Sequence, residues 1–152
     1  MTTRKIALID IENFNGGPIA TPGQAQWCRT MLEQWIKPAA DEHIVVAADV
    51  TSVTNIDLVW PGIRILAGYG ENGADLRLLK VMEENLPERF TGMTLVSKDR
   101  IFAEKVSDLA GQGLPTHVYS WPQALAKRLR FAATEVTTSM NYNFSPDYRK
   151  AA

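Results

Sequence analysis

Residues 5–10 read KIALID, a short apolar run that ends on an acidic residue, Asp10. The run at 5–9 predicts a β-strand, and similar runs follow at 44–48 (IVVAA), 63–67 (IRILA), 93–96 (MTLV) and 116–119 (THVY). Longer stretches with helical spacing separate these runs. Strands that alternate with helices predict an α/β fold with a mostly parallel sheet.

Helices are predicted between the strands from apolar spacing and from end signals. The clearest lies between Thr21, the predicted N-cap, and Pro38, and Gln24 completes its capping box. A second capping box at residues 120–123 predicts the start of the last helix. Further helices are expected near 52–60, over 74–86 and from about 99 to 111.

One domain is expected over residues 1–133, because a chain of 152 residues fits a single core and no linker or repeat interrupts the pattern. The pattern is lost over residues 134–152, which predicts a C-terminal tail. This tail either is loosely packed or forms an arm whose aromatic residues dock on the body or on a partner: Tyr142, Phe144 and Tyr148.

The composition restricts the class of protein. Hydrophobic residues (45%) and charged residues (22%) are as frequent as in ordinary globular proteins, and no apolar stretch approaches the ~20 residues that span a bilayer. We therefore expect a cytoplasmic protein without a membrane segment. A single cysteine, Cys28, excludes an internal disulfide framework. The net charge of −1 argues against a protein that coats duplex DNA, but it allows an enzyme that acts on nucleic acid through an acidic site.

Three aspartates stand at or just beyond the ends of predicted strands: Asp10 after the first, Asp49 after the second and Asp99 after the fourth. Open parallel sheets bind ligands at the carboxyl ends of their strands, where the strand order reverses. If the order is 3-2-1-4-5, Asp10 and Asp99 face each other across that crevice. Two such carboxylates repel each other, and a Mg²⁺ or Mn²⁺ ion relieves the repulsion.

Each acid also has a structural interpretation. Asp10 would cap the loop that follows it, Asp99 would be the N-cap of a helix, and Asp49 would be a turn residue. Asp75, in the first turn of a predicted helix, is stabilised there by the helix dipole alone. The sequence favours a functional role for Asp10 and a turn role for Asp49, and position alone does not decide for Asp75 and Asp99.

Three segments together resemble the NYN domains of the PIN-like ribonuclease superfamily. They are residues 7–13 (ALIDIEN), 73–79 (GADLRLL) and 95–103 (LVSKDRIFA), and residues 113–119 fit the same pattern. The resemblance spans roughly residues 5–130, and the form Asp-x-Ile-Phe-Ala is similar to a bacterial subgroup. It implies a Rossmann-like three-layer sandwich with a five-stranded parallel sheet in the order 3-2-1-4-5. It also implies a metal-dependent endoribonuclease that hydrolyses single-stranded or structured RNA.

The resemblance implies roles for individual residues as well. Asp10, Asp75 and Asp99 would be the catalytic acids that bind Mg²⁺ or Mn²⁺. Asn13 would hydrogen-bond an acid or the substrate, and Ser97 would support the site. Three basic residues beside these acids in the sequence either contact RNA phosphates or form a solvated face: Arg77, Lys98 and Arg100.

The chain carries fewer acids than many members of that family. Leu79, Val81 and Ile101 stand where many members have a further acid. Glu12 and Glu104 are the remaining acids that could supply an oxygen. A function of a different class therefore stays open, namely an RNA-binding or protein-interaction module with weak or no catalysis on the same fold. A homodimer or a protein partner also stays open.

Overall fold

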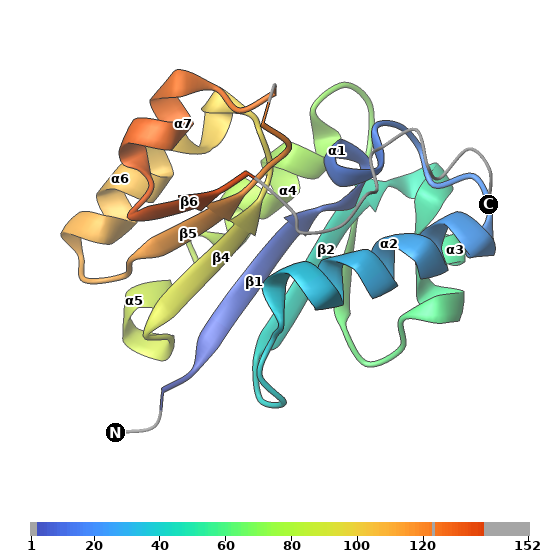
Figure 1. The fold of residues 1–152 in the computed structure, drawn as a ribbon, viewed down its shortest axis with the longest axis horizontal. Coiled ribbons are helices and arrows are strands. Elements are labelled where there is room, and N and C mark those ends of the chain that lie inside the picture. The colour runs from blue at the N-terminus through green and yellow to red at the C-terminus, as the bar shows by residue number, and fades with distance from the viewer. Residues whose placement is uncertain (1–2, 123, 139–152) are drawn as a thin grey trace.

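The computed structural model describes residues 3–122 and 124–138, which form a layered α/β structure around one parallel sheet (Figure 1). The strand order is β3-β2-β1-β4-β5-β6, and all neighbours in the sheet run parallel. The α/β class and the predicted order of the first five strands are thus confirmed. The strands are β1 (Lys5–Asp10), β2 (His43–Asp49), β3 (Arg64–Gly68), β4 (Gly92–Val96), β5 (Thr116–Tyr119) and β6 (Glu135–Thr137).

The sixth strand was not predicted. β6 lies within residues 134–152, where the sequence predicts only a tail, and it pairs with β5 at the edge of the sheet. Residues 139–152 lie outside the described part of the chain, and so do the aromatic residues of the predicted arm, Tyr142, Phe144 and Tyr148. The helices are α1 (Ile11–Asn15), α2 (Pro22–Ile36), α3 (Val50–Val59), α4 (Gly73–Val81), α5 (Leu86–Arg89), η1 (Arg100–Phe102), α6 (Ala103–Gly111) and α7 (Lys127–Ala132).

Side chains that alternate along the strands serve two separate cores. Ile6 and Leu8 of β1 pack into a cluster with residues of α4, α5, α6 and α7. Ile9 points to the opposite face and packs into a cluster with residues of α1, α2 and α3. The sheet is therefore the middle of three layers, and Figure 1 shows α2 lying along β1 and β2 on the second face. None of the described helices is both long and apolar enough to cross a membrane.

Two helix boundaries differ from the prediction. The helix expected over residues 74–86 ends at Val81. A separate short helix, α5, begins at Leu86 after Asn85 in a left-handed conformation (φ 57°), with Pro87 in its first turn. The last helix, expected from residues 120–123, begins at Lys127. The Ser120 hydroxyl donates to the Trp121 carbonyl at 3.2 Å, and Gln123, the other member of the predicted capping box, lies outside the described residues.

The predicted cap of α2 is present and fixes the start of that helix. Thr21 Oγ1 accepts a hydrogen bond from the Gln24 backbone N–H (3.1 Å), and Gln24 Oε1 accepts one from the Ala20 N–H (2.9 Å). An aromatic cluster then joins α2 to α1, since Phe14 contacts the rings of Trp27, Trp35 and Trp121. This packing positions α1 at the carboxyl end of β1.

Candidate functional site

The aspartates that the sequence singles out meet at the carboxyl ends of the strands. β1 and β4 are neighbours, so Asp10 at the end of β1 and Asp99 beyond the end of β4 lie at the same edge. Asp75 lies in the first turn of α4, which follows β3. Asp75 is close enough to hydrogen-bond both Asp10 and Asp99 and is the member that links the other two.

Asp10 is held by the backbone that follows it. Its Oδ1 atom accepts a hydrogen bond from the Asn13 backbone N–H at 3.3 Å, which makes Asp10 the N-cap of α1. Only 7% of the residue is exposed. Asp10 therefore has the capping role that the sequence allowed, and its side chain is also buried beside a second acid.

A close approach of two backbones brings Asp75 to this place. A Cβ atom added to Gly68, the last residue of β3, would lie 2.3 Å from the backbone nitrogen of Ala74. Two backbones can approach this closely only where the residue has no Cβ atom. Gly68 therefore lets the first turn of α4 lie directly against the end of β3. Gly70 (φ 74°) and Asn72 (φ 60°) turn the chain in between. Asp75 is consequently buried, with 7% of its surface exposed.

The two buried acids strongly perturb each other. Burial, the hydrogen bond to Asp75 and the negative charge of Asp75 raise the pKa of Asp10 to about 8. The pKa of Asp75 is also raised, chiefly by burial and further by Asp99. A hydrogen bond between two carboxyl groups requires that one of them carries a proton. The pair therefore needs either a shared proton or a cation to be stable in this place.

A cavity of about 220 Å³ opens beside this pair. Four of its lining residues are acidic and none is lysine or arginine: Asp10, Glu12, Asp49 and Asp75. In the described part of the chain, no three His, Cys, Asp or Glu side chains are arranged to hold one metal ion together. Mg²⁺ is commonly held by one or two carboxylates and keeps several waters. The oxygen donors of Asp10 and Asp75 fit such an ion, and they do not form a three-carboxylate cage with Asp99.

The other two acids of the cavity have structural partners. Glu12 Oε1 accepts a hydrogen bond from the Asp49 backbone N–H (2.7 Å), and Glu12 Oε2 accepts one from the Ser52 hydroxyl (2.9 Å). Asp49 caps α3 through Thr51, and these hydrogen bonds lower the pKa of Asp49. Glu104 is exposed on α6 and does not line the cavity. Neither glutamate is therefore placed as a free oxygen donor.

Asp99 and Ser97 form a local unit after β4. The Asp99 backbone N–H donates to the buried Ser97 Oγ (3.2 Å), and Asp99 Oδ1 accepts from the Ile101 backbone N–H (3.1 Å). Asp99 is thus the N-cap of η1, as one of the two interpretations predicted. Ser97 accepts the hydrogen bond from the backbone of Asp99, and it does not line the acidic cavity.

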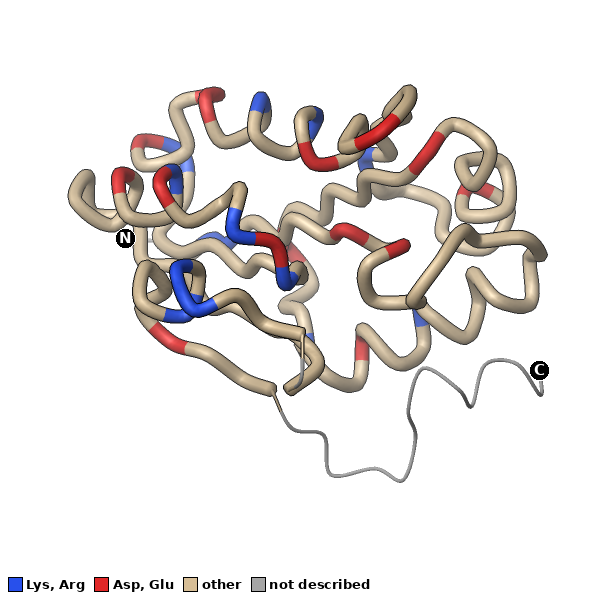
Figure 2. The backbone as a smooth tube through the Cα atoms, turned by 90° about the horizontal axis from the view of Figure 1, so that it is seen from above, with Lys and Arg blue, Asp and Glu red and all other residues tan. Residues whose placement is uncertain are grey.

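Of the predicted substrate-binding residues, Asn13 lines the acidic cavity beside Asp10 and the others do not. The side chains of Arg77, Lys98 and Arg100 are exposed, and none forms an ion pair with a described residue. Figure 2 shows that lysine and arginine positions are interspersed with acidic ones and are not gathered on one basic face.

The three positions at which the family pattern has further acids belong to the core or border it. Val81 is buried, and Leu79 and Ile101 pack against the core cluster on the α4–α7 face of the sheet. An acid at position 81 would be buried without a partner, which is strongly unfavourable. These three positions therefore add no acid to the site.

Apolar residues around the cavity were not predicted from the sequence. Five large hydrophobic residues are exposed among the described ones, and three of them adjoin cavity-lining residues in the chain. These three are Val50 (41% exposed), Tyr69 (74%) and Leu76 (53%), next to Asp49, Gly70 and Asp75 respectively. A tyrosine between two glycines, as in Gly68-Tyr69-Gly70, was the signal available in the sequence.

No protein family and no curated protein matches this sequence. Among solved structures, the chain is similar to a protein of unknown function from Vibrio parahaemolyticus, with a TM-score of 0.65 and 14% identity over 91% of this chain and 94% of that chain. A nicotinamidase from Staphylococcus aureus aligns with a TM-score of 0.41 and 17% identity over 90% of this chain and 100% of that chain. The first likeness shows the α/β fold and carries no information on activity.

Proposed function

We propose that this protein is a divalent-metal-dependent ribonuclease whose site is centred on Asp10 and Asp75. The observation that supports this proposal most is the buried carboxyl pair at the carboxyl end of β1, where the strand order of the sheet reverses. The resemblance of the surrounding segments to NYN domains supports RNA as the substrate. Asp10 and Asp75 would hold one Mg²⁺ or Mn²⁺ ion, and Asp99 would be the third acid of the site, next to Asp75.

The chain's own residues would then have separate tasks. The Asn13 backbone N–H holds Asp10 in place, and Ser97 holds the backbone of Asp99. The exposed cations Arg77, Lys98 and Arg100 would contact phosphates on either side of the scissile bond. A divalent cation bound between Asp10 and Asp75 would neutralise charge on the phosphate and lower the pKa of a bound water molecule.

Cleavage of a fluorescently labelled single-stranded RNA tests the proposal. We expect cleavage with Mg²⁺ or Mn²⁺, none with EDTA, and a loss of at least about a hundredfold for Asp10→Asn and Asp75→Asn. Asp57→Asn is the matched control, because Asp57 is exposed on α3 and has no partner among the described residues. Cleavage that survives EDTA or both substitutions would come from another site or from a contaminant, and the proposal would be wrong.

A second candidate is an RNA-binding module on the same fold with little or no catalysis. The lean acid set favours it, since Leu79, Val81 and Ile101 add no carboxylate and the other acids of the cavity, Glu12 and Asp49, are engaged in hydrogen bonds. Fluorescence anisotropy with the same RNA separates the two candidates. RNA binding without product in any of Mg²⁺, Mn²⁺ or Ca²⁺ would support the binding module, and metal-dependent turnover would exclude it.

A further inference from the structure

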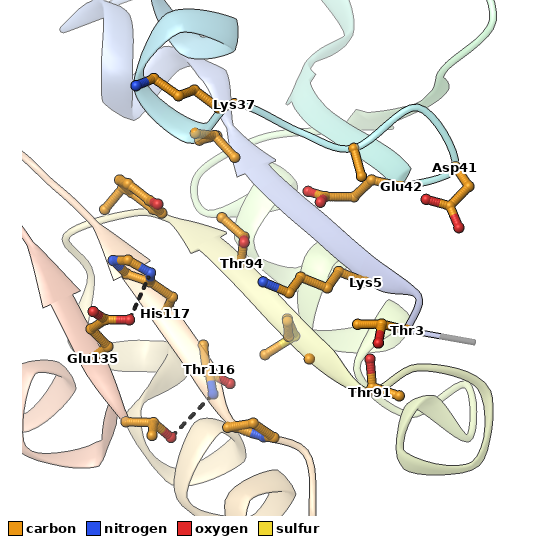
Figure 3. A pocket seen from close by; sticks show the side chains of 17 residues that line it. Thr3, Lys5, Lys37, Asp41, Glu42, Thr91, Thr94, Thr116, His117 and Glu135 are labelled. Carbon is orange, nitrogen blue, oxygen red and sulfur yellow. Dashed lines mark hydrogen bonds and ion pairs between the residues drawn. The ribbon is translucent and has the colours of Figure 1, made fainter. Parts of the chain in front are cut away.

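A larger cavity lies far from the acids, at the amino ends of the strands. Its volume is about 440 Å³, against about 220 Å³ for the acidic cavity (Figure 3). Lys5, Thr94 and His117 contribute to its lining from three neighbouring strands, β1, β4 and β5. Lys5 and Asp10 stand at opposite ends of β1, so the two cavities are separated by roughly 17 Å.

Glu42, in the turn before β2, presents an acceptor that lacks a donor. Its Oε2 atom is buried and has no hydrogen-bond partner among the described residues. Burial correspondingly raises the pKa of Glu42, whereas the neighbouring Ala39 backbone and the charge of Lys5 lower this pKa and so oppose the effect of burial. A buried acceptor without a donor is unfavourable, and a ligand with an N–H group would remove this penalty.

Lys5 presents a cation to the same cavity. Its aliphatic chain lies over Gly92 of β4, where an added Cβ atom would be 3.6 Å from Lys5 Cγ. Figure 3 shows the Lys5 ammonium and the Glu42 carboxylate both reaching into the cavity. The two groups are close enough for the charge of Lys5 to lower the pKa of Glu42, but they do not form an ion pair.

The remaining charged groups around the cavity are paired or exposed. His117 Nδ1 lies 3.2 Å from Glu135 Oε2, and His117 Nε2 lies 2.7 Å from Thr137 Oγ1. Lys37 and Asp41 also line the cavity and are exposed to solvent, as Lys5 is, but in Figure 3 the Lys37 ammonium points away from Glu42. Glu42, with its unpaired buried oxygen, and Lys5, whose ammonium reaches into the same space, are the opposite charges that a ligand in this cavity would bridge.

We propose that this cavity binds a small zwitterion, with the ligand's ammonium group at Glu42 and its carboxylate at Lys5, as an α-amino acid would provide. A ligand with a single charge satisfies one of the two side chains and leaves the other unpaired. An α-amino acid carries both charges on neighbouring carbons and so spans the gap between an acid and a base that do not touch. This site is independent of the ribonuclease proposal.

The common L-α-amino acids, each at millimolar concentration, are the first probes, with thermal stabilisation of the full chain as the readout. The amino acid with the largest effect is then titrated calorimetrically beside its decarboxylated amine and its deaminated acid. We expect each single-charge analogue to bind at least about tenfold more weakly than the amino acid. This series needs no substitution, so it remains decisive even if a variant does not fold.

Two variants then assign the charges. Lys5→Met should weaken the amino acid about tenfold and leave the amine unchanged, and Glu42→Gln should weaken the amino acid and leave the acid unchanged. Lys80→Met and Glu88→Gln, at exposed positions outside the cavity, are the controls. The proposal is overturned if no amino acid stabilises the protein, if the three ligand types bind equally, or if both cavity variants bind as the wild type does.

Discussion

Replacing Asp10 by asparagine is expected to stabilise the metal-free protein at neutral pH. Burial and the contact with Asp75 raise the pKa of Asp10 from 3.8 to about 8. Between these values the folded protein holds a proton that the unfolded chain has released, so a rise in pH favours unfolding. Each pH unit in this window lowers the free energy of unfolding by about 1.4 kcal/mol.

The contribution of Asp10 therefore falls by roughly 2.7 kcal/mol between about pH 5 and about pH 7. Asparagine has nearly the same shape, caps a helix equally well and does not titrate, so Asp10→Asn lacks this loss. His43 and His117 act in the opposite direction. Burial lowers the pKa of each, so their contribution to stability grows as the pH rises through that range. The difference between wild type and variant removes this common background.

Urea unfolding followed by tryptophan fluorescence, in EDTA at several pH values from about 5 to about 7, measures that difference. The free energy of unfolding of Asp10→Asn should rise relative to that of the wild type as the pH rises, whereas the difference between Asp57→Asn and the wild type should stay constant. Mg²⁺ at neutral pH should stabilise the wild type and leave Asp10→Asn nearly unchanged. Parallel pH profiles for the wild type and Asp10→Asn would show that the acid pair is not coupled as described.

Three further substitutions test other parts of the structure. Gly68→Ala should destabilise the protein by more than about 2 kcal/mol in urea unfolding, because the added carbon would meet the backbone of α4, while Gly111→Ala, which faces open space, should be neutral. Ser52→Ala should cost about 1–3 kcal/mol in the same assay, since the buried hydroxyl donates to Glu12 and accepts from the backbone N–H of Ile19, in the loop between α1 and α2. Tyr69→Ala should weaken single-stranded RNA about tenfold in anisotropy measured on Asp10→Asn, and Tyr69→Phe should not, if the exposed ring stacks on a base.

Strand positions were the part of the fold most accessible to sequence reasoning. Each of the first five strands combines an apolar run with turn residues at its ends. No observed strand end differs from the predicted one by more than one residue. β6 is a different case, because three residues with polar neighbours carry no periodic signal. Its formation depends on pairing with β5, and the backbone N–H of Ser120 donates to the Thr137 carbonyl at 3.2 Å. Only the completed sheet provides these partners.

The helix errors have a similar origin. Residues 74–86 keep helical spacing of apolar side chains, since Leu78, Val81, Met82 and Leu86 all enter one core cluster. The interruption lies between Val81 and Leu86 and includes the left-handed Asn85, and the spacing does not report it. At the other end of the chain, Ala126 donates its backbone N–H to the Lys98 carbonyl at 3.0 Å and so fixes the start of α7 from a distant segment.

The sequence singles out the three aspartates that the fold brings near one another, but it does not predict their arrangement. The position of Asp10 at a strand end followed from the sequence, whereas Asp75 joins it through the glycine contact at Gly68, which only the folded chain displays. The predicted trio is therefore a tight pair with Asp99 beside one member. Glu12, a reserve oxygen donor in the sequence, has both oxygens engaged by Asp49 and Ser52.

The acid pair is hard to explain as a purely structural feature. Capping of α1 requires an oxygen acceptor at position 10, and asparagine supplies one without a charge. The cap therefore does not account for a carboxylate whose pKa is raised by burial and by the neighbouring Asp75. In the metal-free chain this carboxylate lowers stability as the pH approaches neutrality. A bound cation reverses the sign of the same interaction, because it replaces repulsion between the carboxylates by attraction of both to one ion. The stability of wild type and Asp10→Asn, with and without Mg²⁺, thus tests whether Asp10 and Asp75 bind a divalent ion. The test requires no RNA.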